Sequence, residues 1–183
     1  FSNEELKPLA QDIDKNSTFP YESIKKIADL GLMGIPWPEK YGGAGMDNLS
    51  LVIAIEEMAK ACVSTAVTVM AHTSLGSGPF ALFGSDSQKE KYLPELSSGK
   101  MIGAFGLTEP NAGSDAGNTQ TTATLKGEKF IINGQKVFCT NAGVAGVIIF
   151  TARIIENGED RGIGALYVDA NTKGLRLGEP EKK

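Results

Sequence analysis

The sequence predicts an α+β fold, in which an all-helical N-terminal domain is followed by a small antiparallel β-barrel or sandwich. Two observations predict this fold. Before residue 100, apolar residues recur mainly at helical spacing, whereas after it short apolar or alternating runs are separated by close turns. A chain of 183 residues is long enough for two small domains. We therefore expect a helical domain over residues 1–100 and a β domain over residues 101–183.

Four or five helices are expected in the first half, because several segments place their apolar residues on one face. The segments begin near residues 1, 21, 48, 64 and 86. Asn48 is expected to cap the third helix, whose apolar stripe runs from Leu51 to Cys62. The fourth helix is expected to bend near its small residues and Pro79, and to turn its apolar residues inward. Those residues are Val67, Met70, Ala71 and Leu75.

Short strands are expected in the second half. Residues 101–107 are apolar or small, as in a buried strand, and residues 119–125 alternate as in a half-buried one. A strand at 128–132 is followed by Asn133-Gly134, which suits a two-residue hairpin turn at positive φ. The partner strand is therefore expected over residues 135–140. Three further strands are expected over residues 147–155, 163–168 and 175–177.

Charge and composition exclude several classes of partner. The net charge is −4, with 18 basic and 22 acidic residues and no basic cluster, which argues against nucleic acid. No apolar run is long enough to span a bilayer. The glycines at positions 42, 43 and 45 lack both a preceding strand and the spacing of a dinucleotide fingerprint.

The residues that most often carry chemistry give no catalytic or metal site. Cys62 and Cys139 form no CxxC pair and are expected to be reduced thiols, which fits an intracellular setting. His72 is the only histidine and has no acid or cysteine partner nearby in the sequence. We expect it to be a packed or surface residue, and we predict no metal site.

Two stretches carry polar groups that could meet one ligand. Residues 108–117 are rich in turn formers and present the hydroxyls of Thr108 and Ser114, and residues 101–125 contain no lysine or arginine. Amides and hydroxyls without cations suit a neutral, flat heterocycle better than a triphosphate. The second stretch places the ring of Phe138 just before the hydroxyl of Thr140. From the residues alone, an ordinary strand-to-strand loop remains equally open for the first stretch. For Phe138, periodicity alone favours core packing.

The stretch from Phe105 to Asp115, Phe-Gly-Leu-Thr-Glu-Pro-Asn-Ala-Gly-Ser-Asp, resembles the flavin-loop signature of the acyl-CoA dehydrogenases. It is closest to the short-chain, butyryl-CoA type of bacteria. Similar motifs occur in that family at residues 1–10, 19–20, 31–36, 41–45 and 132–136. The resemblance therefore extends over essentially all 183 residues.

The resemblance implies that the β domain holds the isoalloxazine ring of FAD. It assigns Thr108 to the pyrimidine end of the ring and Thr140 to the N5 edge, and it lets Ser114 also contact the CoA thioester ligand. Phe105 and Phe138 stand where many relatives have tyrosine and tryptophan. Phenylalanine keeps the aromatic face for stacking but has no polar group on its ring. The implied cofactor-binding residues are Phe105, Leu107, Thr108, Gly113, Ser114, Phe138, Cys139 and Thr140.

The implied reaction is α,β-dehydrogenation of a short-chain acyl-CoA to a trans-2-enoyl-CoA, with electrons passing to an electron-transferring flavoprotein. In the family a glutamate removes the α proton, and it belongs to a C-terminal helical domain that follows residue 183. We therefore expect no catalytic residue here, weak FAD affinity and little or no activity from this chain alone. The resemblance also implies a cytoplasmic protein whose parent is a homotetramer.

Two other functions remain open at this stage. The chain could be a non-enzymatic interaction module that binds flavin or CoA. It could also belong to a flavoprotein oxidase or hydroxylase of the same fold.

Overall fold

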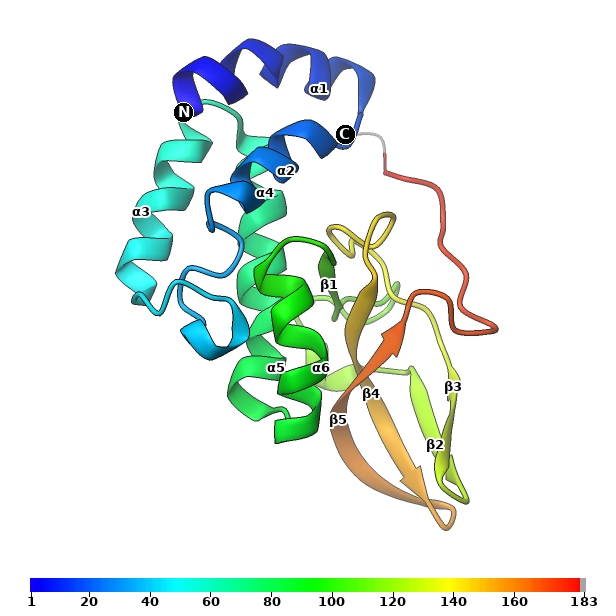
Figure 1. Cartoon of the computed structure of the whole chain (residues 1–183). Helices are drawn as coiled ribbons and strands as arrows, with labels where there is room; N and C mark the ends of the chain where they lie inside the picture. Colours follow the sequence, from blue (N-terminus) through cyan, green and yellow to red (C-terminus); the bar gives the residue numbers. More distant parts are fainter. Residues whose placement is uncertain (182–183) are drawn as a thin grey trace. The chain divides into compact units, whose positions relative to one another are not determined.

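The computed structural model describes residues 1–181 and divides them into two compact units, residues 1–103 and residues 104–181. The first unit is helical and the second contains most of the sheet (Figure 1). The predicted α+β class is therefore confirmed.

Six α-helices are described in the helical unit. Their bounds are α1 (Ala10–Asn16), α2 (Tyr21–Asp29), α3 (Asn48–Ala59), α4 (Val63–Met70), α5 (Gly78–Phe83) and α6 (Asp86–Ser97). Two of them begin with a side-chain cap. Asp47 accepts a hydrogen bond from the Ser50 N–H at 2.8 Å, so the cap of α3 lies one residue before the predicted Asn48. Ser85 and Gln88 form a reciprocal capping box at the start of α6.

The first predicted helix is present but divided. A π-helical turn (Ser2–Leu6) and a 3₁₀ turn (Lys7–Leu9) precede α1. Pro8 explains the division, because proline has no N–H to donate and its ring crowds the preceding turn. Leu6 is nevertheless fully buried, so this irregular start is packed into the unit.

The fourth predicted helix bends as expected but turns a different face inward. A π-helical segment (Ala71–Ser77) joins α4 to α5. Ala71 is buried as predicted, but Val67, Met70 and Leu75 are exposed. Val69 and several small and polar residues of the same rod are buried in their place. The buried hydroxyls of the rod all find acceptors: Thr73 donates to the Met33 carbonyl at 3.1 Å, whereas Thr65 donates to the Cys62 sulfur at 3.2 Å. A face that mixes Val69 with hydroxyl-bearing residues can therefore pack inward here, while Val67, Met70 and Leu75 stay outside.

His72 is completely buried in the π-helical segment, so of the two expected places, packed or surface, it takes the packed one. Its Nδ1 accepts a hydrogen bond from the Gly103 N–H at 3.0 Å, so Nε2 carries the proton and donates to the Leu96 carbonyl at 3.1 Å. The backbones also touch, since a Cβ on Gly76 would lie 2.5 Å from the carbonyl carbon of Gly103. Two glycines thus let the backbone at Gly103, at the end of the helical unit, lie directly against the helical rod.

The sheet is mixed and open, so the predicted antiparallel barrel or sandwich is not confirmed. Its strands are β1 (Gly103–Gly106), β2 (Thr122–Lys126), β3 (Lys129–Asn133), β4 (Val147–Glu156) and β5 (Glu159–Asp169). The order is β1-β4-β2-β3, and β5 also pairs with β4. β2 lies antiparallel to β3 but parallel to β4, with Thr122 opposite Arg153. Long β4 is therefore the strand that organises the sheet.

The predicted hairpin at Asn133-Gly134 is wrong, and residues 135–140 form no strand. β3 instead pairs back onto β2 through a two-residue turn, with Lys126 opposite Lys129. Phe138 has a φ of +55° and Asn141 one of +70°, which an extended strand cannot contain. The expected strand at residues 175–177 is also absent.

Candidate functional site

The two stretches that the sequence singled out lie side by side in the β unit. The Val137 N–H donates to the Thr108 carbonyl at 2.8 Å. The Cys139 thiol donates to the Phe105 carbonyl at 3.1 Å, so the same two stretches are also joined at Phe105, three residues before Thr108. Residues 135–140 therefore follow the end of β1 through individual hydrogen bonds, although they are not a strand. Sequence reasoning found the neighbours but assigned the wrong local structure.

Gly113 and Ser114 come to this region through a tight turn. Glu109 and Ala112 exchange two backbone hydrogen bonds, at 3.0 and 3.1 Å, around Pro110 and Asn111. Gly113 and Ser114 follow this turn and are exposed. Among the described residues, no hydrogen bond joins either of them to the stretch around Phe138.

Several candidate residues present groups that the rest of the unit does not use. No hydrogen bond within residues 1–181 engages the hydroxyls of Thr108, Ser114 or Thr140. The side chain of Phe138 is 63% exposed, and Leu107 is also exposed. Phe138 therefore has no core role, and its left-handed backbone is a conformation that a bulky residue adopts only under constraint. An exposed ring, together with hydroxyls that have no hydrogen-bond partner within residues 1–181, is suited to covering and bonding a flat ligand.

Cys139 is placed as an internal contact. Burial raises the pKa of its thiol, and the hydrogen bond to the Phe105 carbonyl offsets only part of that effect. The thiol packs beside a small core cluster of Ala104, Ala145 and Ile148. A protonated, half-buried thiol is a poor nucleophile, so Cys139 supports the site and does not supply chemistry.

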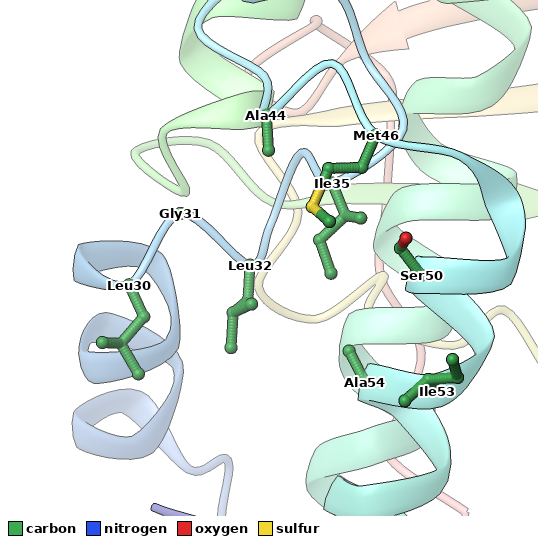
Figure 2. A pocket seen from close by; sticks show the side chains of 9 residues that line it. All are labelled: Leu30, Gly31, Leu32, Ile35, Ala44, Met46, Ser50, Ile53 and Ala54. Atoms are coloured by element: carbon green, nitrogen blue, oxygen red, sulfur yellow. The ribbon is translucent and has the colours of Figure 1, made fainter.

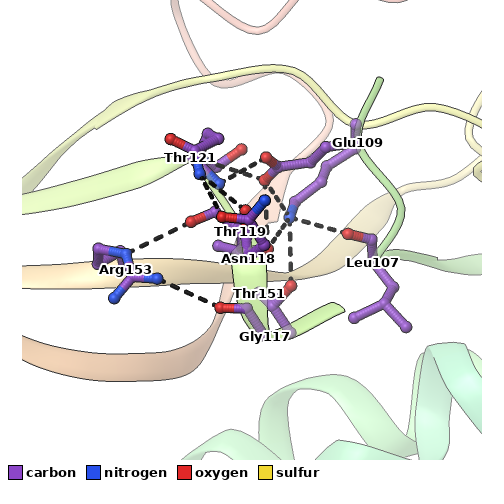
Figure 3. A network of polar contacts seen from close by, with 10 residues as sticks. Leu107, Glu109, Gly117, Asn118, Thr119, Thr121, Thr151 and Arg153 are labelled. Atoms are coloured by element: carbon purple, nitrogen blue, oxygen red, sulfur yellow. Dashed lines mark hydrogen bonds and ion pairs between the residues drawn. The ribbon is translucent and has the colours of Figure 1, made fainter. Parts of the chain in front are cut away.

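Sequence reasoning missed a buried ion pair directly behind these residues. Lys136 Nζ lies 2.7 Å from Glu109 Oε1, and their side chains are only 12% and 4% exposed. The same ammonium donates to the carbonyl of Leu107 at 3.0 Å (Figure 3). Glu109 and Lys136 are far apart in the sequence and form no motif, so only the fold reveals the pair.

The carboxylate of Glu109 stays ionised despite its burial. Burial opposes ionisation, but hydrogen bonds from Lys136 and from the N–H groups of Gln120 and Thr121 outweigh it and lower the pKa of Glu109 to about 2. Glu109 is therefore a structural anion, and no proton transfer near neutral pH is assigned to it.

A separate apolar hollow lies in the helical unit. It has a volume of about 450 Å³ and is bounded by the end of α2, the following loop and α3 (Figure 2). Its one hydroxyl, that of Ser50, is engaged by the Asp47 cap at 2.7 Å. The lining residues are Leu30, Gly31, Leu32, Ile35, Ala44, Met46, Ser50, Ile53 and Ala54. The hollow has no group for acid–base chemistry.

Within residues 1–181, no three histidine, cysteine or acidic residues gather as a metal site would require. In the same part of the chain, no helix combines the length and hydrophobicity needed to cross a bilayer.

Comparison with known proteins assigns both halves of the chain. The family profile "Acyl-CoA dehydrogenase, N-terminal domain" matches residues 1–100, and "Acyl-CoA dehydrogenase, middle domain" matches residues 104–183. The short-chain specific acyl-CoA dehydrogenase of Clostridium acetobutylicum is 45% identical over the whole chain, which covers 48% of that protein. This chain thus spans about half the length of the curated relatives it matches.

Solved structures agree with this assignment. Butyryl-CoA dehydrogenase from Megasphaera elsdenii has a TM-score of 0.92 at 38% identity, over 100% of this chain and 49% of that one. An acyl-CoA dehydrogenase complexed with FAD from Bacillus anthracis has a TM-score of 0.87 at 36% identity, over 98% of this chain and 30% of that one. Since family profiles, curated relatives and folds all coincide along the chain, it belongs to the acyl-CoA dehydrogenase family.

Proposed function

We propose that the natural protein containing this chain is an FAD-dependent dehydrogenase that converts short-chain acyl-CoA thioesters to trans-2-enoyl-CoA. The single observation that carries the proposal is the pairing of residues 105–108 with residues 136–139, which brings together the two stretches that the family uses for flavin. The relatives named short-chain specific acyl-CoA dehydrogenase and butyryl-CoA dehydrogenase support the chain-length class.

The exposed groups of the β unit fit the isoalloxazine ring. We assign Thr108 to its pyrimidine end, Thr140 to its N5 edge and the open ring of Phe138 to one face. The two cations nearest the loop, Lys136 and Arg153, are both engaged by protein oxygens, so the site offers hydroxyls and amides to a neutral ring. The full proposed set is Phe105, Leu107, Thr108, Gly113, Ser114, Phe138, Cys139 and Thr140.

In this proposal the chain binds and orients FAD and the thioester ligand, and its own residues transfer no proton. FAD, when bound, supplies the acceptor for the hydride that leaves the β carbon of the acyl group. Ser114 also contacts the thioester ligand, and hydrogen bonds at this end of the site polarise it. The base that removes the α proton is assigned to the portion of the relatives that this chain does not span.

The helical unit supports an apolar portion of the substrate. Val63, Val67 and Met70 occupy one face of α4 and are exposed, and an acyl chain would bury such a face favourably. We further propose a helical domain over residues 1–100 and a flavin domain over 101–183. The complete protein is proposed to be a cytoplasmic homotetramer that passes electrons to an electron-transferring flavoprotein.

The test is the visible spectrum of the full natural chain, with and without the double substitution Thr108→Val and Thr140→Val. The wild type should carry a flavin band that bleaches on anaerobic addition of butyryl-CoA, and the double variant should lose both colour and bleaching. A variant that keeps its colour and its bleaching would refute the site. Rapid reoxidation of the bleached wild type by oxygen would favour an oxidase over a dehydrogenase.

A further inference from the structure

Lys136 is surrounded by more acceptors than an ammonium group needs. Its Nζ donates to the Leu107 carbonyl at 3.0 Å, Glu109 Oε1 at 2.7 Å, Thr151 Oγ1 at 3.2 Å and Thr119 Oγ1 at 3.3 Å. These oxygens come from the end of β1, the loop that follows it and strand β4 (Figure 3). One buried side chain therefore joins three segments that are distant in the sequence.

Glu109 closes the loop from the other side. Its Oε2 accepts from the Gln120 N–H at 2.6 Å and its Oε1 from the Thr121 N–H at 3.0 Å. The residue that opens the loop is thus bonded to the two residues that end it, immediately before β2. The intervening residues include the exposed Gly113 and Ser114, which cannot hold the loop through packing of their own.

A second cation holds the outer end of the same loop. Arg153 Nε donates to the Thr119 carbonyl at 3.4 Å and Nη2 to the Gly117 carbonyl at 3.3 Å (Figure 3). Arg153 is also paired with Asp160 at 2.7 Å on the surface. Arg153 contacts only the far end of the loop, whereas Lys136 alone also reaches the strand end beside Thr108.

A buried ion pair contributes little net stability to a folded protein. Desolvating both charges costs about as much as their attraction returns, so a well-packed apolar pair of similar volume is often equally stable. What a buried pair specifies is geometry, because an ammonium and a carboxylate tolerate few arrangements without loss of hydrogen bonds. Here the specified geometry is the distance between the end of β1 and residues 136–140.

We propose that Lys136 is a positioning residue for the ring-binding site, and that the Lys136–Glu109 pair holds the Thr108 and Phe138 stretches at the separation a flat heterocycle requires. This inference rests on the proposed function. Lys136 touches no ligand in this scheme. It acts through the Leu107 carbonyl on one side and through the adjoining Val137 N–H, which bonds the Thr108 carbonyl, on the other.

The experiment compares three variants of the full natural chain with the wild type by titration with FAD. Lys136→Met removes the ammonium but leaves Glu109 as a buried, unpaired carboxylate, which can impair folding. The double variant Lys136→Met with Glu109→Gln removes both charges and so separates positioning from simple stability. Lys60→Met is the matched control, because this lysine forms only surface ion pairs with Glu56 and Glu57.

Three quantities are measured: the dissociation constant, the number of sites per folded chain, and the fluorescence of the flavin at saturation. For the double variant we expect a dissociation constant raised about tenfold, a normal number of sites and a brighter, less constrained flavin. A merely structural role would lower the number of sites and leave the affinity and the fluorescence of bound flavin unchanged. Lys60→Met should match the wild type in all three.

The proposed function and the positioning role would be refuted by different results. If the wild type binds FAD and the double variant has the same dissociation constant and fluorescence, the positioning role is wrong while the proposed function stands. If the wild type binds no FAD, the proposed function is wrong and the positioning role falls with it. If Lys60→Met weakens binding as much as the double variant does, a general charge effect replaces the proposal.

Discussion

Acid should weaken the helical unit through a single buried histidine. The fold favours neutral His72, because its Nδ1 faces the Gly103 N–H and cannot take a second proton without losing that hydrogen bond. Burial lowers the pKa of His72 to about 4, and the hydrogen bond to the Leu96 carbonyl offsets only part of this effect. The unfolded chain takes up a proton near pH 6.5, whereas the folded chain does so only near pH 4.

The magnitude follows from that difference. One pKa unit corresponds to about 1.36 kcal/mol, so lowering the pKa from 6.5 to about 4 contributes about 3 kcal/mol. Because the folded pKa is depressed, the contribution is complete above pH 6.5 and is lost progressively as the pH falls to about 4. Below that value both states are protonated, and His72 adds no further pH dependence.

Trp37 makes this measurable for the helical unit alone. It is the only tryptophan, it is buried, and its Nε1 donates to Ser77 Oγ at 2.8 Å in the segment that carries His72. Urea unfolding followed by tryptophan fluorescence at several pH values is compared between the wild type and His72→Asn. The wild type should lose about 3 kcal/mol more than the variant between pH 7 and pH 4. Parallel pH profiles for the two proteins would refute the reasoning.

Three further predictions concern single substitutions. Phe138→Gly should leave the free energy of unfolding within about 1 kcal/mol of the wild type, because glycine suits the left-handed backbone. The same substitution should weaken FAD binding, so denaturation and flavin titration are measured on one variant. Gly76→Ala should lower the free energy of unfolding by about 2 kcal/mol or more, because the added Cβ meets the Gly103 backbone. Gly113→Ala should lower it far less, because a Cβ there has no atom within 4 Å, and chemical denaturation of the two variants compares the two losses. Ser85→Ala should cost about 1 kcal/mol by loss of the α6 capping box, measured by Trp37 fluorescence, and an unchanged unfolding midpoint would contradict it.

The two Asn-Gly pairs show how far local sequence can predict this fold. Asn133-Gly134 was predicted to make a hairpin and does not, whereas Asn157-Gly158 joins β4 to β5 with both residues at positive φ, +53° and +82°. The two pairs differ in what surrounds them. A Cβ on Gly134 would lie 2.3 Å from Thr121 Oγ1, so the chain there crosses closely past the start of β2 and does not turn back. Crossing of this kind is set by tertiary structure and leaves no local signal.

Periodicity predicted the presence of the helices better than their faces. α3 was assigned one apolar stripe, but its apolar residues occupy most of its circumference, and Leu49, Val52 and Ile53 are exposed. On α4 the buried side contains Thr65 and Thr68, whose hydroxyls bond to neighbouring atoms of their own helix or its cap. Hydrophobicity alone cannot identify a buried face when the polar residues can satisfy themselves locally.

The candidate site divides in the same way. The motif around Thr108 and the stretch around Phe138 were predicted from sequence, and the structure places these stretches beside each other. The ion pair behind them was not predicted, because a lysine and a glutamate without regular spacing carry no pattern. The groups proposed to meet a ligand thus lie in recognisable sequence motifs, whereas the ion pair proposed to position them is found only through contacts between distant segments.

The two-residue connection between β4 and β5 also bears on the order of folding. These long strands pair from Glu156 opposite Glu159 outward, so each new contact closes only a slightly larger loop. The parallel pairing of β2 with β4 must instead bring Thr122 to Arg153, across everything between them. We therefore expect two hairpins to assemble early and independently, and the step that joins them to limit the rate at which the β unit becomes native.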